Sequence, residues 1–246
     1  MKNLRWQVLL SAGLVLLTVG LYVLHFFIFR DTRHIFIYLL GDIAFLPVQV
    51  LFVTLIINRL LSNRDKRVKL RKLNMVIGTF FSEAGGELLR LFLRMERNSE
   101  ALKAAVLHDQ RWDDRDFRKR LSRLQEYRYE IDFNRGDWFE LKAFLASRRG
   151  FLLSLLGNPN LLEHDKFTDL LWAVFHLTDE LVHREDFNGL PPADRQHLAQ
   201  DLRRAFQLLT LEWLAYMQHL KRDYPYLFSL AIRTNPFEPS ASPIFS

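Results

Sequence analysis

The sequence predicts an all-α protein in which a two-helix transmembrane hairpin is followed by a cytoplasmic helical bundle. The first 61 residues hold two long apolar stretches, over residues 7–29 and 35–58. The rest of the chain is rich in charge, but apolar residues recur in it at spacings of three and four, which is typical of amphipathic helices. No run of alternating apolar and polar residues indicates a strand.

The first apolar stretch, residues 7–29, contains no Asp, Glu, Lys or Arg. At about 1.5 Å per residue, a helix of this length crosses a hydrocarbon core about 30 Å thick. Lys2 and Arg5 resemble the basic start of a secretory signal peptide. The apolar stretch is too long for such a signal, however, and a second one follows at once. We therefore expect a retained transmembrane helix.

The second stretch, residues 35–58, is long enough to span a membrane but contains Gly41, Asp42, Pro47 and Gln49. An ionised carboxylate within hydrocarbon costs at least ~2.5 kcal/mol, so Asp42 needs a partner or a role. Two geometries are open. The stretch is either one continuous tilted helix, or it breaks at Gly41 and leaves Asp42 as the N-cap of the spanning helix.

In a tight hairpin, Asp42 lies level with Tyr22 and His25 of the first stretch, and either residue can donate a hydrogen bond to it. One interpretation of this polar group is an interhelical pin. The other is a proton or ion path through Asp42 and His25. One acid and one histidine are too few to cross a bilayer, so the structural interpretation is favoured.

The segment between residues 59 and 72 carries seven Lys and Arg against a single acid, Asp65, a surplus equal to the net charge of +6 of the whole chain. Six of these residues are expected to contact lipid head groups, namely Arg64, Lys66, Arg67, Lys69, Arg71 and Lys72. The loop between the two stretches has only Arg30 and Arg33. Because Lys and Arg collect on the cytoplasmic side, both termini are predicted to be cytoplasmic, in a bacterial inner (plasma) membrane.

Composition excludes several classes of function. Beyond residue 72 the acidic and basic residues nearly balance, so the chain lacks the basic footprint of a nucleic-acid-binding protein. It contains no cysteine, which excludes disulfides, thiolate metal sites and cysteine nucleophiles. Glycine loops that bind phosphate are absent, as is the G-x-S-x-G elbow of hydrolases. No cofactor is expected, and a binding module is favoured over an enzyme.

The cytoplasmic part is predicted to begin with a basic juxtamembrane and amphipathic connecting helix over residues 62–95, broken at Gly85-Gly86. The helical domain proper covers residues 96–234. Its helices are expected at about 113–131, from Asp137 to Gly157, at 163–184, at 192–222 and up to Arg233. Asp137 and Glu140 form the D-x-x-E pattern that is typical of a helix start. Residues 235–246, rich in Pro and Ser, are expected to be mobile.

The helix expected at 163–184 places His176, Glu180 and His183 on one face, at positions i, i+4 and i+7. A Glu-x-x-His spacing occurs in carboxylate-bridged di-iron bundles. Those bundles need a second such motif, and the nearest candidates, Glu212 and His219, are seven residues apart. A polar helix face is therefore the main interpretation, and a metal-binding site is the minor one.

Three strings carry a resemblance, namely HIFIYLLGDIAFLPVQVLFVTLIINRLL, KLNMVIGTFFSEAGGELL and DYPYLFSLAIRTNPF. They resemble uncharacterised bacterial two-span integral membrane proteins. The resemblance implies a membrane location and a helical cytoplasmic domain, without an activity or site residues.

Three hypotheses for function follow. The favoured one is a membrane-anchored helical module that binds a protein partner or itself beneath the lipid bilayer. The second is an oligomeric channel or transport accessory that uses Asp42. The third is a metal-binding enzyme built on the helix of His176.

Overall fold

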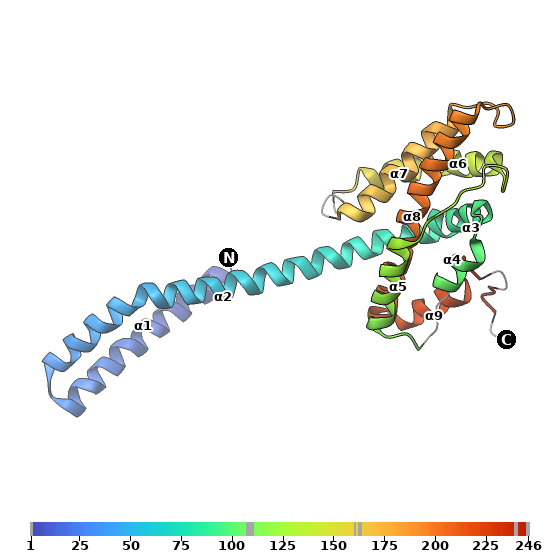
Figure 1. Cartoon of the computed structure of the whole chain (residues 1–246). Helices are drawn as coiled ribbons and strands as arrows, with labels where there is room; N and C mark the ends of the chain where they lie inside the picture. Colours follow the sequence, from blue (N-terminus) through green and yellow to red (C-terminus); the bar gives the residue numbers. More distant parts are fainter. Residues whose placement is uncertain (1, 107–110, 160, 162–163, 239–240, 245–246) are drawn as a thin grey trace. The chain divides into compact units, whose positions relative to one another are not determined.

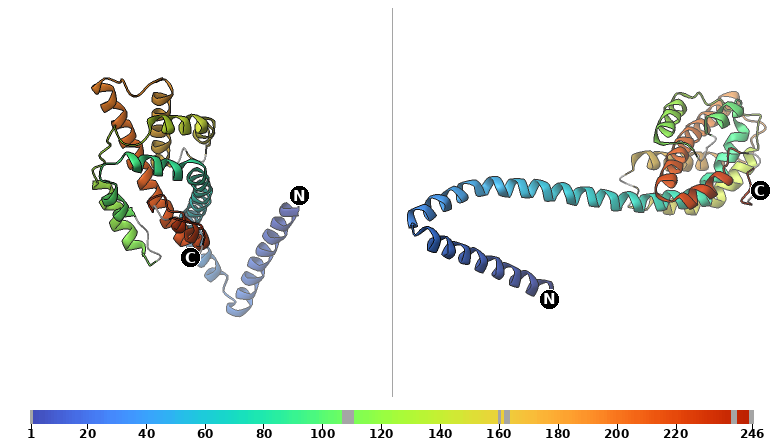
Figure 2. Two further views of the ribbon diagram at one scale, coloured as in Figure 1. Left: turned by 90° about the vertical axis from the view of Figure 1, so that its right-hand side faces the viewer. Right: turned by 90° about the horizontal axis from the view of Figure 1, so that it is seen from below.

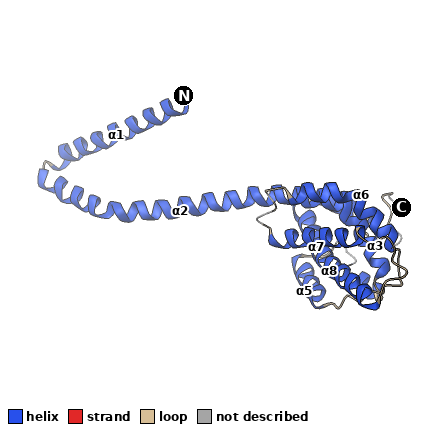
Figure 3. Cartoon of the chain, turned by 90° about the horizontal axis from the view of Figure 1, so that it is seen from above, coloured by secondary structure: helices blue, strands red, loops and turns tan. Residues whose placement is uncertain are grey.

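The computed structural model describes residues 2–106, 111–159, 161, 164–238 and 241–244; the side chains of residues 2–5, 34 and 63–72 lie outside this description. Within these ranges the regular structure is helical and no strand occurs (Figure 3). The prediction of an all-α protein is confirmed. The chain divides into two compact units, Met1–Lys66 and Arg67–Ser246.

The first unit contains α1 (Lys2–Phe29) and the first part of α2 (Thr32–Phe80) (Figure 1). Both helices are long and apolar enough to cross a membrane. Their candidate spans, Trp6–Phe29 and Ile35–Ser62, each have a mean hydropathy of 2.2, and none of either span is buried within the chain.

A two-residue turn joins α1 to α2. Arg30 adopts a left-handed conformation with φ of 50°, and its N–H donates to the carbonyl of Phe26 over 2.8 Å. This geometry ends a helix and satisfies one of its last carbonyls. Asp31 begins the next helix, because its Oδ1 accepts the N–H of Arg33 over 2.9 Å.

Helix α2 is continuous from Thr32 to Phe80 and includes Gly41 and Pro47. Of the two geometries open for the second apolar stretch, the structure therefore has the continuous helix. Asp42 lies inside α2 and is not an N-cap.

The second unit contains the end of α2, a π-helical turn (Phe81–Gly85) and helices α3 to α9. The bounds of these helices are α3 Gly86–Met95, α4 Ser99–Val106, α5 Asp114–Glu126, α6 Trp138–Leu156, α7 Asp165–Val182, α8 Pro192–Asp223 and α9 Pro225–Arg233. The helices expected at 163–184 and 192–222 are confirmed, whereas α4 was not predicted.

Helix α8 runs through the middle of the second unit and packs against α3, α5, α7 and α9, while α6 packs on α7 (Figure 2). The ring of Phe206 on α8 is fully buried and packs against residues of two other segments of the core. Its centroid lies 5.7 Å from that of Phe92 on α3 and 5.1 Å from that of Tyr129. Elements from both ends of this unit thus meet on one helix.

The expected break at Gly85-Gly86 is wrong, because the backbone stays helical there. The helix forms a π-helical turn here, which contains one residue more than an α-helical turn. In this turn the N–H of Gly86 donates to the carbonyl of Phe81. A Cβ on Gly85 would lie 2.6 Å from the Phe81 ring and 2.8 Å from the Phe80 ring. Glycine is therefore required by the close approach of two aromatic rings and not by a bend in the chain.

The expected connecting helix, residues 62–95, does not stand apart from the domain that follows it. Phe80, Leu88 and Phe92 are fully buried, and Phe80 packs edge-on against Phe167 of α7 with centroids 5.3 Å apart. Its second half therefore belongs to the core of the second unit.

Helix α5 ends at Glu126, earlier than the expected residue 131. The chain after it is extended as far as Ile131, which forms an isolated backbone bridge with Glu96. The Glu96 carboxylate is buried and accepts the N–H groups of Asn98 and Glu130 over 3.0–3.1 Å. Amphipathic periodicity gives no information about such a contact between distant segments. The helix was therefore predicted to extend to residue 131, beyond its actual end.

The segment beyond Asn235 was expected to be mobile, but its first residues are part of the core. Asn235 and Phe237 are 2% and 0% exposed, and Oδ1 of Asn235 accepts the N–H of Phe237 over 3.1 Å. The burial of one aromatic ring outweighs the Pro- and Ser-rich composition around it.

Two glycines provide a matched test of this fold. Gly136 has φ of +72°, and a Cβ there would lie 2.5 Å from Cγ of Met95. We expect Gly136→Ala to destabilise the protein by about 1–3 kcal/mol.

Gly150 lies inside α6 with no atom near its Cβ position, so Gly150→Ala is expected to stabilise the protein by about 0.5–1 kcal/mol. Thermal unfolding of the full-length variants measures both, and equal effects would contradict the described turn.

Candidate functional site

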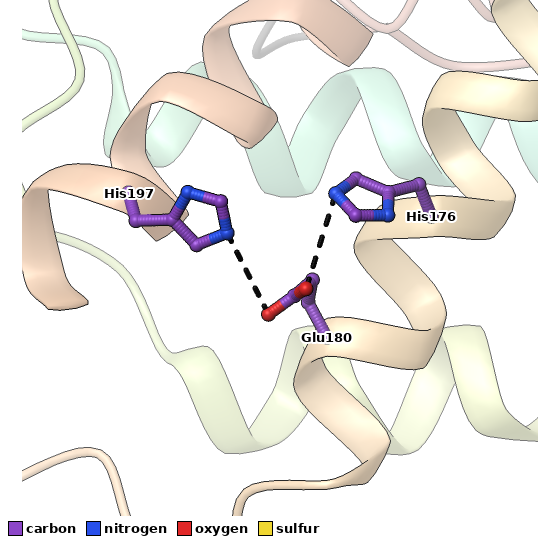
Figure 4. Close-up of side chains that lie close together, drawn as sticks. All are labelled: His176, Glu180 and His197. Atoms are coloured by element: carbon purple, nitrogen blue, oxygen red, sulfur yellow. Dashed lines mark ion pairs between the residues drawn. The ribbon is translucent and has the colours of Figure 1, made fainter.

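Two helices of the second unit, α7 and α8, bring together the cluster of side chains that is the best candidate site. His176 and Glu180 are one turn apart on α7, and His197 and Asp201 are one turn apart on α8. Residues at i and i+4 share a helix face. Because α7 and α8 pack along each other, the two pairs face one another, and Figure 4 shows three of the four side chains converging.

His176, Glu180 and His197 each offer one donor atom, and these three atoms all lie within 4.8 Å of one another. Nε2 of His176 and Nε2 of His197 each lie 3.3 Å from Oδ2 of Asp201. The same nitrogens lie 3.9 Å and 3.7 Å from the carboxylate oxygens of Glu180. His176, Glu180 and His197 therefore surround a common point (Figure 4), and the Asp201 carboxylate lies beside both imidazoles.

Asp201 is the most enclosed member of the cluster, with 5% of its side chain exposed. Its Oδ2 atom is buried and accepts no hydrogen bond within the described part of the chain, although two imidazole nitrogens lie near it. A buried carboxylate is costly unless a cation or hydrogen-bond donors compensate its charge. A cation bound at this oxygen atom would compensate its charge.

Arg184 holds the cluster from the loop between the two helices. Its guanidinium donates to Oε2 of Glu180 over 2.6 Å and to both carboxylate oxygens of Asp194 over 2.7 and 3.0 Å. These charge-assisted hydrogen bonds lower the pKa of Glu180 and the pKa of Asp194 from their ordinary values. They also raise the pKa of Arg184. The Glu180 carboxylate is thus kept ionised and fixed in orientation.

The sequence predicted His176, Glu180 and His183 as neighbours on one helix face, and the structure brings the first two together in the cluster. His176 and Glu180 meet in the cluster, whereas His183 lies at the C-terminal end of α7. There its Nδ1 is 2.7 Å from the carbonyl of Asp179. The sequence analysis missed His197 and Asp201, although they repeat the four-residue spacing of His176 and Glu180.

The two other residues weighed as metal ligands lie elsewhere on α8. Glu212 is 5% exposed, and burial raises its pKa to about 7. Nδ1 of His219 lies 2.8 Å from Asp223 and 3.2 Å from the amide nitrogen of Asn74. Neither residue takes part in the cluster.

In the first unit, Asp42 is exposed on α2, while Tyr22 and His25 of α1 are partly buried. The His25 ring lies against Phe29 of its own helix, with centroids 4.6 Å apart. Both interpretations of Asp42, the interhelical pin and the ion path, stay predictions.

The lipid-contacting residues predicted from the sequence are Arg64, Lys66, Arg67, Lys69, Arg71 and Lys72. Their backbone is helical, but their side chains lie outside the described residues, so their contact with lipid stays a prediction.

Comparison with known proteins gives a family without a stated activity. Residues 2–61 match the domain described as the N-terminal helical domain of MJ1433, and residues 69–233 match the domain described as the C-terminal helical domain of that uncharacterised protein. The uncharacterised protein MJ1433 of Methanocaldococcus jannaschii is 42% identical over 238 residues, which is 97% of this chain and 96% of that protein. No solved structure matches. This relative comes from an archaeon, so the expected bacterial source is not supported.

The hydrogen bonds of Arg184 predict a pH-dependent stability. Glu180 and Asp194 have folded-state pKa values below their ordinary values of 4.5 and 3.8. Their contribution to stability is therefore present above those ordinary values and is lost as the pH falls through the folded-state values. We expect Arg184→Met to lower the unfolding temperature by a few degrees at pH 7, and by less at pH 3.

The control for this prediction is Arg149→Met. Arg149 pairs with Asp179 over 3.3 Å, and both side chains are more exposed, so this substitution should have a small effect at either pH. A deficit of equal size at pH 3 and pH 7 in Arg184→Met would rule out the ion pairs as its cause.

Proposed function

We propose that this chain, which belongs to the MJ1433 family with N- and C-terminal helical domains over residues 2–61 and 69–233, is a membrane-anchored helical module. In this proposal α1 and α2 cross the membrane, and the second unit lies on the cytoplasmic side, where it binds a protein partner or a second copy of the chain.

The observation that carries the proposal is that two apolar helices have no buried residue in either candidate span. Leu16 and Leu40, for example, are 72% and 70% exposed, and no part of either candidate span is buried in the chain. Soluble proteins rarely expose contiguous apolar patches larger than a few hundred Å². A lipid bilayer about 30 Å thick matches the length of both helices.

The distribution of charge supports the orientation. The turn between the spans has Arg30 and Arg33, whereas the basic segment 59–72 follows the second span, and Lys2 and Arg5 precede the first. Lys and Arg within about 15–20 residues of a span set its orientation, with the richer side in the cytoplasm. Both termini are then cytoplasmic.

This topology predicts that the full-length chain stays in the membrane fraction after alkaline carbonate washing. A green fluorescent protein fused after Ser246 should fluoresce, and an alkaline phosphatase fused at the same point should be inactive. Replacing Arg64, Lys66, Arg67 and Lys69 with Gln should give a mixed orientation. Replacing Arg115, Arg118 and Lys119 on α5 with Gln should not, because these residues lie more than about 20 residues from the spans in the sequence. Release of the chain by carbonate would disprove membrane insertion.

A surface on the second unit supports the binding of a partner. A cavity of about 510 Å³ lies between the end of α2, α8 and α9, and Met75, Tyr216 and Leu227 are among its lining residues. Met75 is 66% exposed, and Leu227 is 38% exposed. Apolar residues gathered around a cavity favour association with another protein.

Self-association through this surface is tested by Leu227→Glu, which places a charge beside the cavity. We expect the dissociation constant of the dimer to rise at least about tenfold, equivalent to ~1.4 kcal/mol, as measured by sedimentation of the full-length chain in detergent. Leu153→Glu is the control, because Leu153 on α6 is similarly exposed, at 44%, and does not line the cavity. A wild-type chain that is strictly monomeric would contradict self-association.

A further inference from the structure

We propose that His176, Glu180, His197 and Asp201 form a binding site for a divalent transition-metal ion of the zinc class. The proposal is independent of the membrane location, because all four residues belong to the second unit. It extends the pair His176 and Glu180, which share α7, with a second pair from α8.

The spacing of the donor atoms fits such an ion. Zinc binds imidazole nitrogens and carboxylate oxygens at about 2.0–2.2 Å in tetrahedral geometry, which places neighbouring donor atoms about 3.3–3.6 Å apart. The Asp201 oxygen lies 3.3 Å from each histidine nitrogen. The Oε1 atom of Glu180 lies 3.9 Å from the His176 nitrogen and needs to move by only a few tenths of an ångström.

The state of Asp201 gives a second, independent reason. Its Oδ2 atom is buried without a hydrogen bond in the described structure, and the Nε2 atoms that face it belong to two half-exposed histidines, 48% and 50% exposed. A buried carboxylate oxygen without a hydrogen bond is costly. A divalent cation bound by both nitrogens and by this oxygen would compensate the charge of the carboxylate.

The charge and composition of the cluster select the class of ion. Two carboxylates balance the charge of a divalent cation. Two imidazoles favour zinc and its transition-metal neighbours over Mg²⁺ and Ca²⁺, which prefer oxygen ligands. The half-exposed histidine rings leave the site open to an ion from solvent.

Arg184 would not bind the ion itself but would orient the Glu180 carboxylate that does. It occupies Oε2 of Glu180 and leaves Oε1, the atom that faces His176, for the ion. Partners of this kind hold a ligating carboxylate in place, and their loss typically weakens metal affinity about 10–100-fold.

Zinc binding to the full-length protein tests the proposal. After treatment with EDTA and its removal, titration with ZnCl₂ at pH 7.5 is expected to show one saturable ion per chain, and a parallel titration with MgCl₂ is expected to show none at the same concentrations. Because the ion would hold ligands from both α7 and α8, zinc should also raise the unfolding temperature.

Two variants and one matched control locate the site. His197→Ala removes a half-exposed ligand without disturbing the core, and Asp201→Asn keeps the shape of the buried one. Each is expected to weaken zinc affinity by more than about 100-fold, which exceeds the usual loss from an outer residue, and to abolish the thermal shift. His183→Ala also removes a histidine, but one outside the cluster, and should bind zinc like the wild type.

Three results would overturn the proposal. The first is a wild-type chain that binds no zinc at micromolar concentrations. In that case the four side chains contact one another without holding a metal ion. The second is zinc binding that His197→Ala leaves unchanged, which would place the ion elsewhere. The third is equal binding of Mg²⁺, which would show carboxylate attraction without the contribution of the histidines.

Discussion

The fold of the second unit depends on the burial of α8 on several sides at once. Its buried apolar residues include Leu198, Leu202, Phe206, Leu209 and Met217, and a helix with apolar residues on more than one face is stable only when other helices surround it. Some of the buried polar groups on this helix are satisfied within the helix itself. The Thr210 hydroxyl, for example, donates to the carbonyl of Phe206 over 2.8 Å. The first turns of α8, where apolar burial is less complete, carry the two side chains that face α7.

The loop that returns the chain from α7 to α8 is fixed from two directions. Phe187 is buried against Trp138 and Phe139, with ring centroids 6.1 and 5.0 Å apart, and Arg184 is hydrogen-bonded to the side chains of both flanking helices. A site whose supporting residues are held by packing and by hydrogen bonds keeps its geometry better than one on a free loop. The cluster on α7 and α8 is therefore preorganised.

Sequence periodicity was sufficient for the helices but not for the contacts between distant segments. It predicted the two apolar stretches, the long α8 and the cap at Asp137, whose Oδ1 accepts the N–H groups of Phe139 and Glu140, because each of these depends on neighbours in the chain. The π-turn at Gly85 was predicted as a break, since the rings that require the glycine are visible only in space. The burial of Phe237 was missed for the same reason.

The candidate site was half visible in the sequence. His176 and Glu180 stand out because both lie on one turn of α7, and the sequence alone placed His183 with them on the same face. The structure puts His183 at the end of α7 and brings His197 from α8 instead. A polar pair repeated at the same spacing on a neighbouring helix is weak evidence until the two helices are known to pack together. Tertiary packing, which no single segment encodes, determines the ligand set.

The late position of α8 in the chain has a consequence for how the protein is made. The ribosome adds about 5–20 residues per second from the N-terminus, so α3, α5 and α7 emerge before the helix against which they pack. Phe237, which completes the core, emerges later still. The core of the second unit is consequently completed only after α8 and Phe237 have been synthesised, when both apolar helices of the first unit have already been made. A nascent chain that ends before α8 therefore exposes the faces of α3, α5 and α7 that pack against it.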